Sequence, residues 1–195
     1  KDQFVATVSH ELRTPLNAIQ GWAIMLKNEQ VPPDRRPHAL NVIVRNTEVL
    51  TRLISDLLDL SRAMSGKLRL NVELLEIGSV VACVLEAILP EAQRRAISIE
   101  THVEPGSLMG DRARLQQVLW NLLANALKFS PAGSTIELTA RRCERWLTVT
   151  VRDHGLGIES AFLPHLFETF RQADASFARQ HGGLGLGLAI VRNLV

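Results

Sequence analysis

Residues 1 to about 64 place apolar side chains at alternating spacings of three and four, with no strand-like alternation among them. This periodicity predicts amphipathic helices with one apolar stripe each. We expect a first helix up to about Leu26, followed by a break at Val31-Pro32-Pro33-Asp34. The second helix has a strict repeat, typical of a coiled-coil or bundle seam, which is formed by Leu40, Ile43, Thr47, Leu50, Ile54, Leu57 and Ser61.

The second helix has a broad apolar face, because Leu53, Leu60 and Met64 form a parallel stripe beside the seam. Two helices alone cannot bury so wide a surface. An antiparallel hairpin that dimerises into a four-helix bundle can bury it. The pattern therefore predicts a homodimer formed through the helical hairpin.

After Ser65-Gly66 the pattern changes to short strands alternating with helices. The expected strands are residues 67–72, 97–103, 135–143 and 146–151, and the expected helices are residues 77–95, 111–129, 159–166 and from about 185 onward. Such a mixture favours an α/β sandwich with helices on one sheet face. We expect a hairpin domain at 1–64 and a sandwich domain at 67–195 that is truncated at its C-terminus.

Charge and composition argue against several classes of protein. Hydrophobic residues make up 46% of the chain, so a real core can form. The formal net charge of +2 gives no reason to expect nucleic-acid binding. Arg94-Arg95 and Arg141-Arg142 are isolated pairs, and we interpret both as solvated surface.

The cysteines and the hydropathy bear on location. Cys83 and Cys143 lie far apart without a CxxC motif, so they indicate neither a disulfide framework nor a zinc site. No apolar run approaches the roughly 20 residues that a membrane span needs. We expect a cytoplasmic fragment without membrane contact of its own. Whether the parent protein has a membrane anchor elsewhere is left open by the sequence.

His10 lies off the apolar stripe of the first helix. It shares a polar face with Thr14 and Asn17, at i, i+4 and i+7, and Glu11 is its neighbour. A carboxylate beside an imidazole can fix its tautomer and raise the basicity of the other nitrogen. Pro15 removes a helical hydrogen bond and is expected to bend the helix here. A plain surface histidine is the alternative; an HExxH zinc motif is excluded, because position 14 is Thr.

The helix after Asp111, its expected N-cap, presents Asn121, Asn125 and Lys128 on one face. Asn is a poor helix former, so its repeated use in one direction suggests a ligand. Amide oxygens suit Mg²⁺, and an ammonium group suits phosphate oxygens. An ordinary polar helix face explains this helix equally well when it is considered alone.

Two glycine-rich segments follow. In the first, a strand leads into Asp153-x-Gly155-x-Gly157, where an Asp can accept a hydrogen bond from an exocyclic amine such as that of adenine. In the second, residues 182–188 open the final helix and offer bare amides to an anion. Neither matches the dinucleotide-binding or P-loop patterns, and a tight turn is the alternative for each.

Together these segments resemble the conserved boxes of histidine protein kinases. Residues 4–16, around Ser9-His10-Glu11, resemble the H box, and residues 121–129 the N box. Residues 153–158 resemble the first glycine box, 167–172 the F box, and 183–188 the second glycine box. The H box is very specific, and five boxes in the right order and spacing make coincidence negligible.

The resemblance implies a dimerising helical hairpin and a separate ATP-binding sandwich, of the type shared with gyrase, heat-shock chaperone and mismatch-repair ATPases. It implies ATP-dependent autophosphorylation of His10, followed by phosphoryl transfer to an Asp of a response-regulator receiver domain in two-component signalling. Glu11 would be the base for His10. Thr14 would position water when the phosphorylated partner is dephosphorylated.

The resemblance also assigns the ATP and Mg²⁺ site. Asn125 would coordinate Mg²⁺, and Asp153 would bind adenine. Residues 171–182 would form a mobile lid. The remaining nucleotide-binding residues would be Asn121 and Lys128 at the phosphates, Gly155 and Gly157 beside Asp153, Arg171 and Arg179 as phosphate contacts, and Gly183, Gly185 and Gly187 at the phosphate end.

Some positions depart from the family pattern. Thr169 stands where the F box often has Pro, and Phe129 where the N box often has Tyr. Family members usually continue beyond the final helix into further strands. Two rivals remain: an ATPase that moves a partner, which leaves the H box unexplained, and a scaffold with degenerate boxes, which should lack key residues that are present here. The balance between kinase and phosphatase activity stays open.

Overall fold

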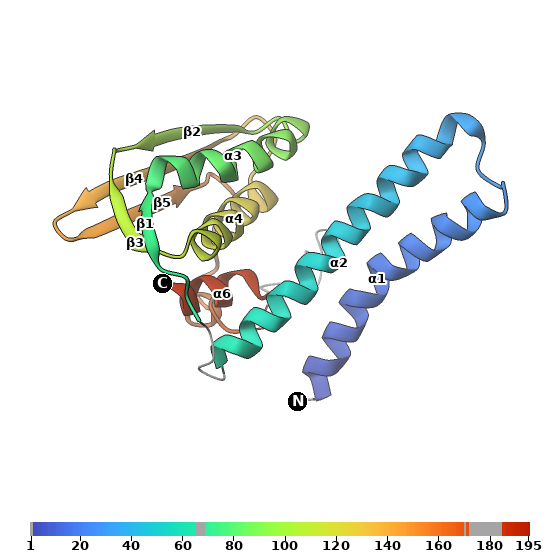
Figure 1. The fold of residues 1–195 in the computed structure, drawn as a ribbon, viewed down its shortest axis with the longest axis horizontal. Helices are drawn as coiled ribbons and strands as arrows, with labels where there is room; N and C mark the ends of the chain where they lie inside the picture. The colour runs from blue at the N-terminus through green and yellow to red at the C-terminus, as the bar shows by residue number, and fades with distance from the viewer. Residues whose placement is uncertain (1, 65–68, 170, 172–184) are drawn as a thin grey trace. The chain divides into compact units, whose positions relative to one another are not determined.

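The computed structural model describes residues 2–64, 69–169, 171 and 185–195 (Figure 1). The described residues fall into two compact units. The first unit consists of the described residues within Lys1–Lys67 and Glu168–Leu186. The second unit consists of those within Leu68–Phe167 and Gly187–Val195. None of the described helices is long and apolar enough to cross a membrane.

The first unit is built on a pair of long helices, α1 (Asp2–Lys27) and α2 (Arg36–Met64), with the short 3₁₀ helix η1 (Pro33–Arg35) between them. The predicted break is confirmed. Glu29 adopts a left-handed φ of 55° after the end of α1, and Gln30 N–H donates to the Met25 carbonyl. The rings of Trp22 and His38 meet edge to face near this turn, with centroids 5.8 Å apart.

The hairpin leaves much apolar surface exposed. Helix α1 continues through Pro15, whose side chain is buried. Along both helices, however, large apolar side chains remain exposed, namely Leu16, Ile24, Met25, Leu40, Val44, Val49, Ile54 and Leu58. Isolated exposed apolar residues are normal, but a set this dense along two helices is typical of an interaction surface.

The second unit contains two sheets. A three-stranded sheet has the order β2 (Ser98–Val103), β4 (Thr135–Cys143), β5 (Trp146–Arg152), with β2 parallel and β5 antiparallel to β4. A two-stranded antiparallel sheet pairs β1 (Glu73–Glu76) with β3 (Ser107–Gly110). The helices of this unit are α3 (Ile77–Arg94), α4 (Arg112–Phe129), α6 (Gly187–Leu194) and the 3₁₀ helix η2 (Leu163–His165).

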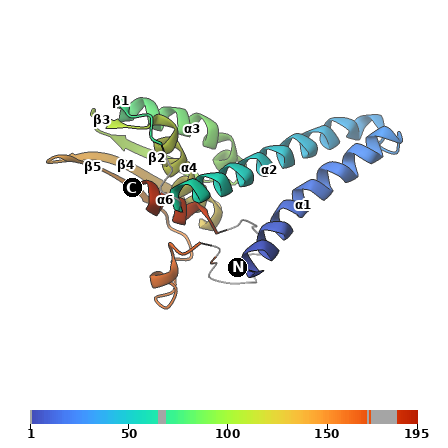
Figure 2. The same ribbon diagram turned by 60° about the horizontal axis from the view of Figure 1, so that its bottom comes forward.

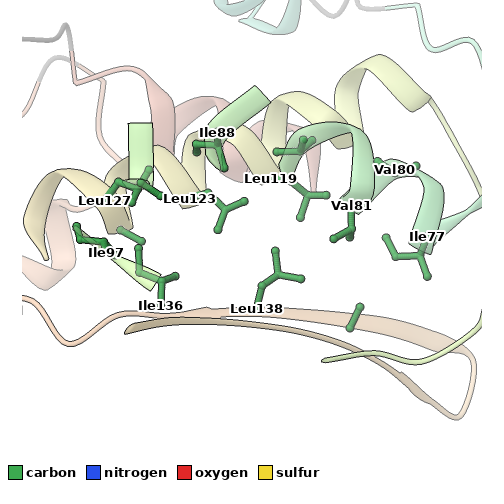
Figure 3. Packing of buried hydrophobic residues seen from close by; sticks show 14 of the residues in the cluster. Ile77, Val80, Val81, Ile88, Ile97, Leu119, Leu123, Leu127, Ile136 and Leu138 are labelled. Carbon is green, nitrogen blue, oxygen red and sulfur yellow. The ribbon is translucent and has the colours of Figure 1, made fainter. Parts of the chain in front are cut away.

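The core of the second unit lies between helices α3 and α4 and one face of the three-stranded sheet (Figure 3). Alternate residues of β4, Ile136, Leu138 and Ala140, are fully buried because a strand turns every second side chain inward. Ile136 and Leu138 face Leu119 and Leu123 of α4. The predicted α/β sandwich with helices on one sheet face is therefore confirmed.

Two expected elements were wrong. Residues 69–72 form no strand; Leu70 and Val72 are exposed, and the chain first pairs at β1, where Leu75 is buried. Residues 159–166 contain only η2, a single 3₁₀ turn. The last helix, expected from about 185, is confirmed; it begins at Gly187, since Gly185 has a left-handed φ of 66°.

Candidate functional site

The imidazole of His10 projects from α1 into solvent, with a side chain 78% exposed. Its Nδ1 lies 3.6 Å from Oε1 of Glu11, whose side chain is more buried. The Thr14 hydroxyl donates a hydrogen bond to the His10 carbonyl at 3.2 Å. The structure therefore brings the three predicted residues His10, Glu11 and Thr14 together on one turn, with a carboxylate beside Nδ1 and an accessible ring.

Asp111 fixes the start of α4, as predicted. Its carboxylate accepts hydrogen bonds from the backbone N–H of Arg114 at 3.2 Å and of Asn71 at 2.9 Å. The Asn71 N–H, ahead of the Arg114 N–H, lowers the pKa of Asp111, while partial burial opposes the shift. The cap thus ties the segment before β1 to the helix that presents the asparagines. The bond from Asn71 spans 40 residues of sequence and has no local signal.

The middle of α4 meets the start of α6. A Cβ added to Gly187 would lie 3.4 Å from both Cγ and Oδ1 of Asn121, so the α6 backbone packs closely on this amide. Among the described residues, Asn121 Nδ2 is one of two buried side-chain polar atoms without a hydrogen-bond partner. Asn125 and Lys128 follow on α4, both half-buried, and Lys128 Nζ lies 5.0 Å from the Phe129 ring centroid.

The C-terminal end of α4 meets the first glycine loop. Asp153 follows β5 directly, and its Oδ1 accepts a hydrogen bond from Gly155 N–H at 2.8 Å. A Cβ on Gly155 would lie 2.6 Å from the Phe129 carbonyl oxygen, which no real Cβ tolerates. Gly157 has a left-handed φ of 70°. The two glycines are therefore required for different reasons, close approach at Gly155 and backbone conformation at Gly157.

Gly185 and Arg171 meet through their backbones. A Cβ on Gly185 would lie 2.8 Å from the Arg171 carbonyl oxygen. The Arg171 guanidinium donates to the Glu168 carboxylate at 2.9 Å. No feature of the sequence assigns a role to Glu168 or to Phe129. The other predicted residues of this region, Arg179 and Gly183, lie outside the described residues, as do 172–182 of the expected lid.

The residues around α4 fit an anionic, oxygen-rich ligand. A buried amide donor without a partner, as at Asn121 Nδ2, is costly unless a ligand or water satisfies it. Amide oxygens of the kind that Asn121 and Asn125 offer are ligands that Mg²⁺ accepts, and an ammonium group such as that of Lys128 suits phosphate oxygens. The chemistry of this helix face thus suits a nucleotide with its metal ion.

Comparison with known proteins places the chain. Residues 1–66 match the family described as His Kinase A (phospho-acceptor) domain, and residues 110–195 match the Histidine kinase-, DNA gyrase B-, and HSP90-like ATPase family. The solved structure of histidine kinase AdeS from Acinetobacter baumannii is 30% identical with a TM-score of 0.71, covering 95% of this chain and 85% of that one. The chain belongs to the histidine kinase family.

Two further relatives of this histidine kinase chain are informative. Full-length ShkA, solved in complex with AMPPNP, is 32% identical with a TM-score of 0.70. The match covers 99% of this chain and 40% of the ShkA chain. Signal transduction histidine-protein kinase BarA of Escherichia coli (strain K12) is 37% identical over the whole chain. The histidine kinase chain spans only 22% of the length of BarA.

Proposed function

We propose that this chain is the catalytic core of a protein histidine kinase that uses ATP to phosphorylate His10. Residues 1–64 would be the dimerisation and phosphoacceptor domain, and residues 67–195 the nucleotide-binding domain. The single observation on which this rests is the exposed His10 ring held beside the Glu11 carboxylate. A partner-moving ATPase would have no use for that arrangement.

His10 is suited to act as the nucleophile. The Glu11 carboxylate beside Nδ1 favours a proton on that nitrogen, which leaves the Nε2 lone pair for attack. Nε2 forms a bond to the γ-phosphorus while the bond from that phosphorus to the β,γ-bridging oxygen breaks and ADP leaves. Glu11 stabilises the positive charge that the ring gains. The exposure of His10 lets a nucleotide held by another part of the protein reach it.

Asp153 and Asn121 are proposed to hold opposite ends of ATP. Gly155 N–H already engages Oδ1 of Asp153, so Oδ2 is the oxygen available to the adenine amino group. At the phosphate end, Asn121 Nδ2 and Lys128 offer donors, and the α6 backbone packs on Asn121 at Gly187. Further phosphate contacts are proposed for Arg171, Arg179, Gly183 and Gly185, with Gly157 shaping the base end.

Asn125 is the proposed protein ligand for Mg²⁺, with its side-chain oxygen. When bound, the ion neutralises charge on the phosphates, which is most of what phosphoryl transfer requires besides positioning. Asn121, one turn earlier on α4, would support the same ion or the adjacent phosphate. Both roles follow from the shared direction of these side chains on one helix face.

The hairpin is proposed to dimerise, because it exposes a dense set of large apolar side chains. Replacing Ile54 and Leu58, both exposed on α2, by Glu should convert a dimer to a monomer in light scattering after gel filtration. Replacing the similarly exposed Leu89 of α3 by Glu is the matched control and should leave the mass unchanged. A dimeric Ile54→Glu/Leu58→Glu variant would contradict the hairpin interface.

The phosphoryl group is proposed to pass from His10 to an Asp of a response-regulator receiver domain, in the cytoplasm. Exposure of His10 and the bundle surface around it makes this group reachable for a second protein. Thr14, one turn away and exposed, is placed to orient water in the reverse, dephosphorylating reaction. The unpaired state of Cys83 and Cys143 agrees with a reducing compartment.

Labelling with γ-³²P-ATP and Mg²⁺ tests the proposal. Wild type should gain acid-labile, alkali-stable label, and His10→Gln should gain none. His38→Gln removes another exposed histidine of the same hairpin and should label like wild type. If wild type binds ATP but never becomes labelled, or if His10→Gln labels normally, the autokinase proposal is wrong and a partner-moving ATPase is favoured.

A further inference from the structure

The two arginine pairs of the sequence differ sharply in the structure. Arg94 and Arg95, at the end of α3, both pair with the carboxylate of Glu91, Arg95 through Nε at 2.7 Å. Both guanidinium groups therefore share one carboxylate partner within their own helix. The interpretation of this pair as ordinary surface agrees with these contacts.

The second pair, with one neighbour, is not satisfied in this way. Arg141, Arg142 and Arg145 are exposed, and among the described residues none of them forms an ion pair. The one hydrogen bond from these guanidinium groups runs from Arg142 Nε to the Glu144 carbonyl at 3.5 Å, which is long. Three arginines without an ion pair among the described residues therefore lie within five residues, which also include Glu144.

These arginines sit on a projecting part of the fold, the hairpin tip, which we define as residues 141–148. Strand β2 pairs with β4 only as far as Ala140, so the tip extends past the neighbouring strand. Figures 1 and 2 both show this end of β4 and β5 extending beyond β2. The backbone N–H of Arg142 donates to Glu104 at 3.2 Å, which anchors the base of the tip.

The tip also has two features that cost the isolated fold stability. Trp146, opposite Cys143 in the register, is 72% exposed. Glu144 has a left-handed φ of 55°, a conformation that suits Gly or Asn. An exposed indole and a strained turn residue, beside three unpaired cations, bring no benefit to the folded chain by itself. Such features are better explained by contact with a partner.

We propose that the hairpin tip is a docking surface for an acidic surface of a partner protein. Trp and Arg are the residues enriched at binding hot spots, and the whole β4–β5 hairpin contains no Lys, a residue depleted there. The planar guanidinium forks bind carboxylates with two hydrogen bonds each, and Trp146 supplies apolar area. A surface this small fits the weak, transient contacts of signalling proteins.

The position of the tip keeps it apart from the nucleotide site. Strand β5 runs from Trp146 at the tip to Arg152, next to Asp153. Seven residues of strand separate these ends by roughly 20 Å. A partner on the tip would therefore leave the Asp153 end of the sandwich open, so docking and nucleotide binding can be measured independently.

The test uses the whole chain and a synthetic ten-residue peptide of glutamates with two central leucines. Amide shifts in ¹⁵N spectra and Trp fluorescence follow the titration at low salt. We expect shifts confined to residues 141–148 and neighbouring strand positions. The variant Arg141→Gln/Arg142→Gln/Arg145→Gln should bind about tenfold more weakly. Arg94→Gln/Arg95→Gln removes two paired arginines and should bind within twofold of wild type.

A second peptide, with serines in place of the leucines, should bind more weakly, and Trp146→Ala should abolish that difference. Equal loss in both arginine variants, or shifts outside the tip, would overturn the proposal. So would binding of phosphatidylserine vesicles or duplex DNA through the tip without binding of the glutamate peptide, since these would identify a membrane or a nucleic acid instead. The single variant Arg145→Gln keeps the test valid if the triple variant does not fold.

Discussion

Gly155 offers the sharpest test of how the nucleotide site is assembled. In Gly155→Ala the new methyl group would lie 2.6 Å from the Phe129 carbonyl oxygen and 2.8 Å from Asp153 Oδ1. To reach an ordinary contact of 3.4 Å, the loop must retreat from the end of α4 by about 0.8 Å. Both obstacles are fixed, one by helix backbone and the other by the Gly155 N–H bond itself.

The cost follows from these contacts. Overpacking in a tight site destabilises by about 1–3 kcal/mol. The retreat also weakens the exposed hydrogen bond to Asp153, which is worth about 0.5–1 kcal/mol. We therefore expect Gly155→Ala to lose about 2–3 kcal/mol of unfolding free energy. For a domain of this size that lowers Tm by roughly 10–20 °C.

Gly187→Ala is the matched control, because it adds the same methyl group at the other glycine that contacts α4. There the new Cβ would meet Asn121 at 3.4 Å, an ordinary contact with a side chain. Gly187 is the first residue of α6, where Ala is tolerated or preferred. Its unfolding free energy, from urea titration followed by circular dichroism, should stay within about 0.5 kcal/mol of wild type. Equal stability of the two variants would refute the steric argument.

Further predictions concern the second unit. Asp111→Ala should lower the unfolding free energy by about 1 kcal/mol, while Asp111→Asn retains most of the cap. The pKa of Asp111 is lower in the folded than in the unfolded chain, so ionised Asp111 stabilises the fold at pH values above the ordinary carboxyl pKa of about 3.9. This stabilisation is lost as the pH falls through the lowered pKa of the folded state. Urea titrations between about pH 5 and 2 should show this loss in wild type but not in Asp111→Asn. Ala96 has a left-handed φ of 55° after α3, so Ala96→Gly should raise the unfolding free energy by about 1 kcal/mol. The control Ala87→Gly, inside α3, should lower it by about as much. A shift of Tm in the same direction for both variants would contradict this reasoning.

The elements that could be predicted are those with strong local signals. Asp111 followed by a helical repeat marked α4, and the buried alternation of Ile136, Leu138 and Ala140 marked β4. The strands β1 and β3 have four residues each and pair with each other across more than thirty residues, so neither has a sufficient local pattern. Their existence depends on tertiary pairing, which periodicity does not register.

The candidate site shows the same division. The residue types at His10, Asn121 and Asp153 indicated the proposed phosphoacceptor and nucleotide-binding roles. Glu11 lies beside His10 because it is its neighbour in sequence. The contact of Gly155 with Phe129 joins distant segments, and so could not be read from either. The pairing of Arg94 and Arg95 with Glu91 is local to a helix that the sequence predicts, at spacings of three and four. For Arg141, Arg142 and Arg145, only the fold shows that no described carboxylate lies within ion-pair distance.

Helix α4 sets the spacing of the proposed nucleotide site. Asp111 caps its first turn, Asn121 in its middle packs against Gly187, and the carbonyl of its last residue, Phe129, lies against Gly155. The rise of about 1.5 Å per residue places Asn121 and Phe129 roughly 12 Å apart along the axis. Helix α4 therefore holds Asn121 and the Phe129–Gly155 contact at a fixed separation, and Gly155 and Gly187 are brought to it from distant parts of the sequence. Loss of the Asp111 cap should disturb the first turn, whereas a clash at Gly155 should move the first glycine loop away from the C-terminal end of α4.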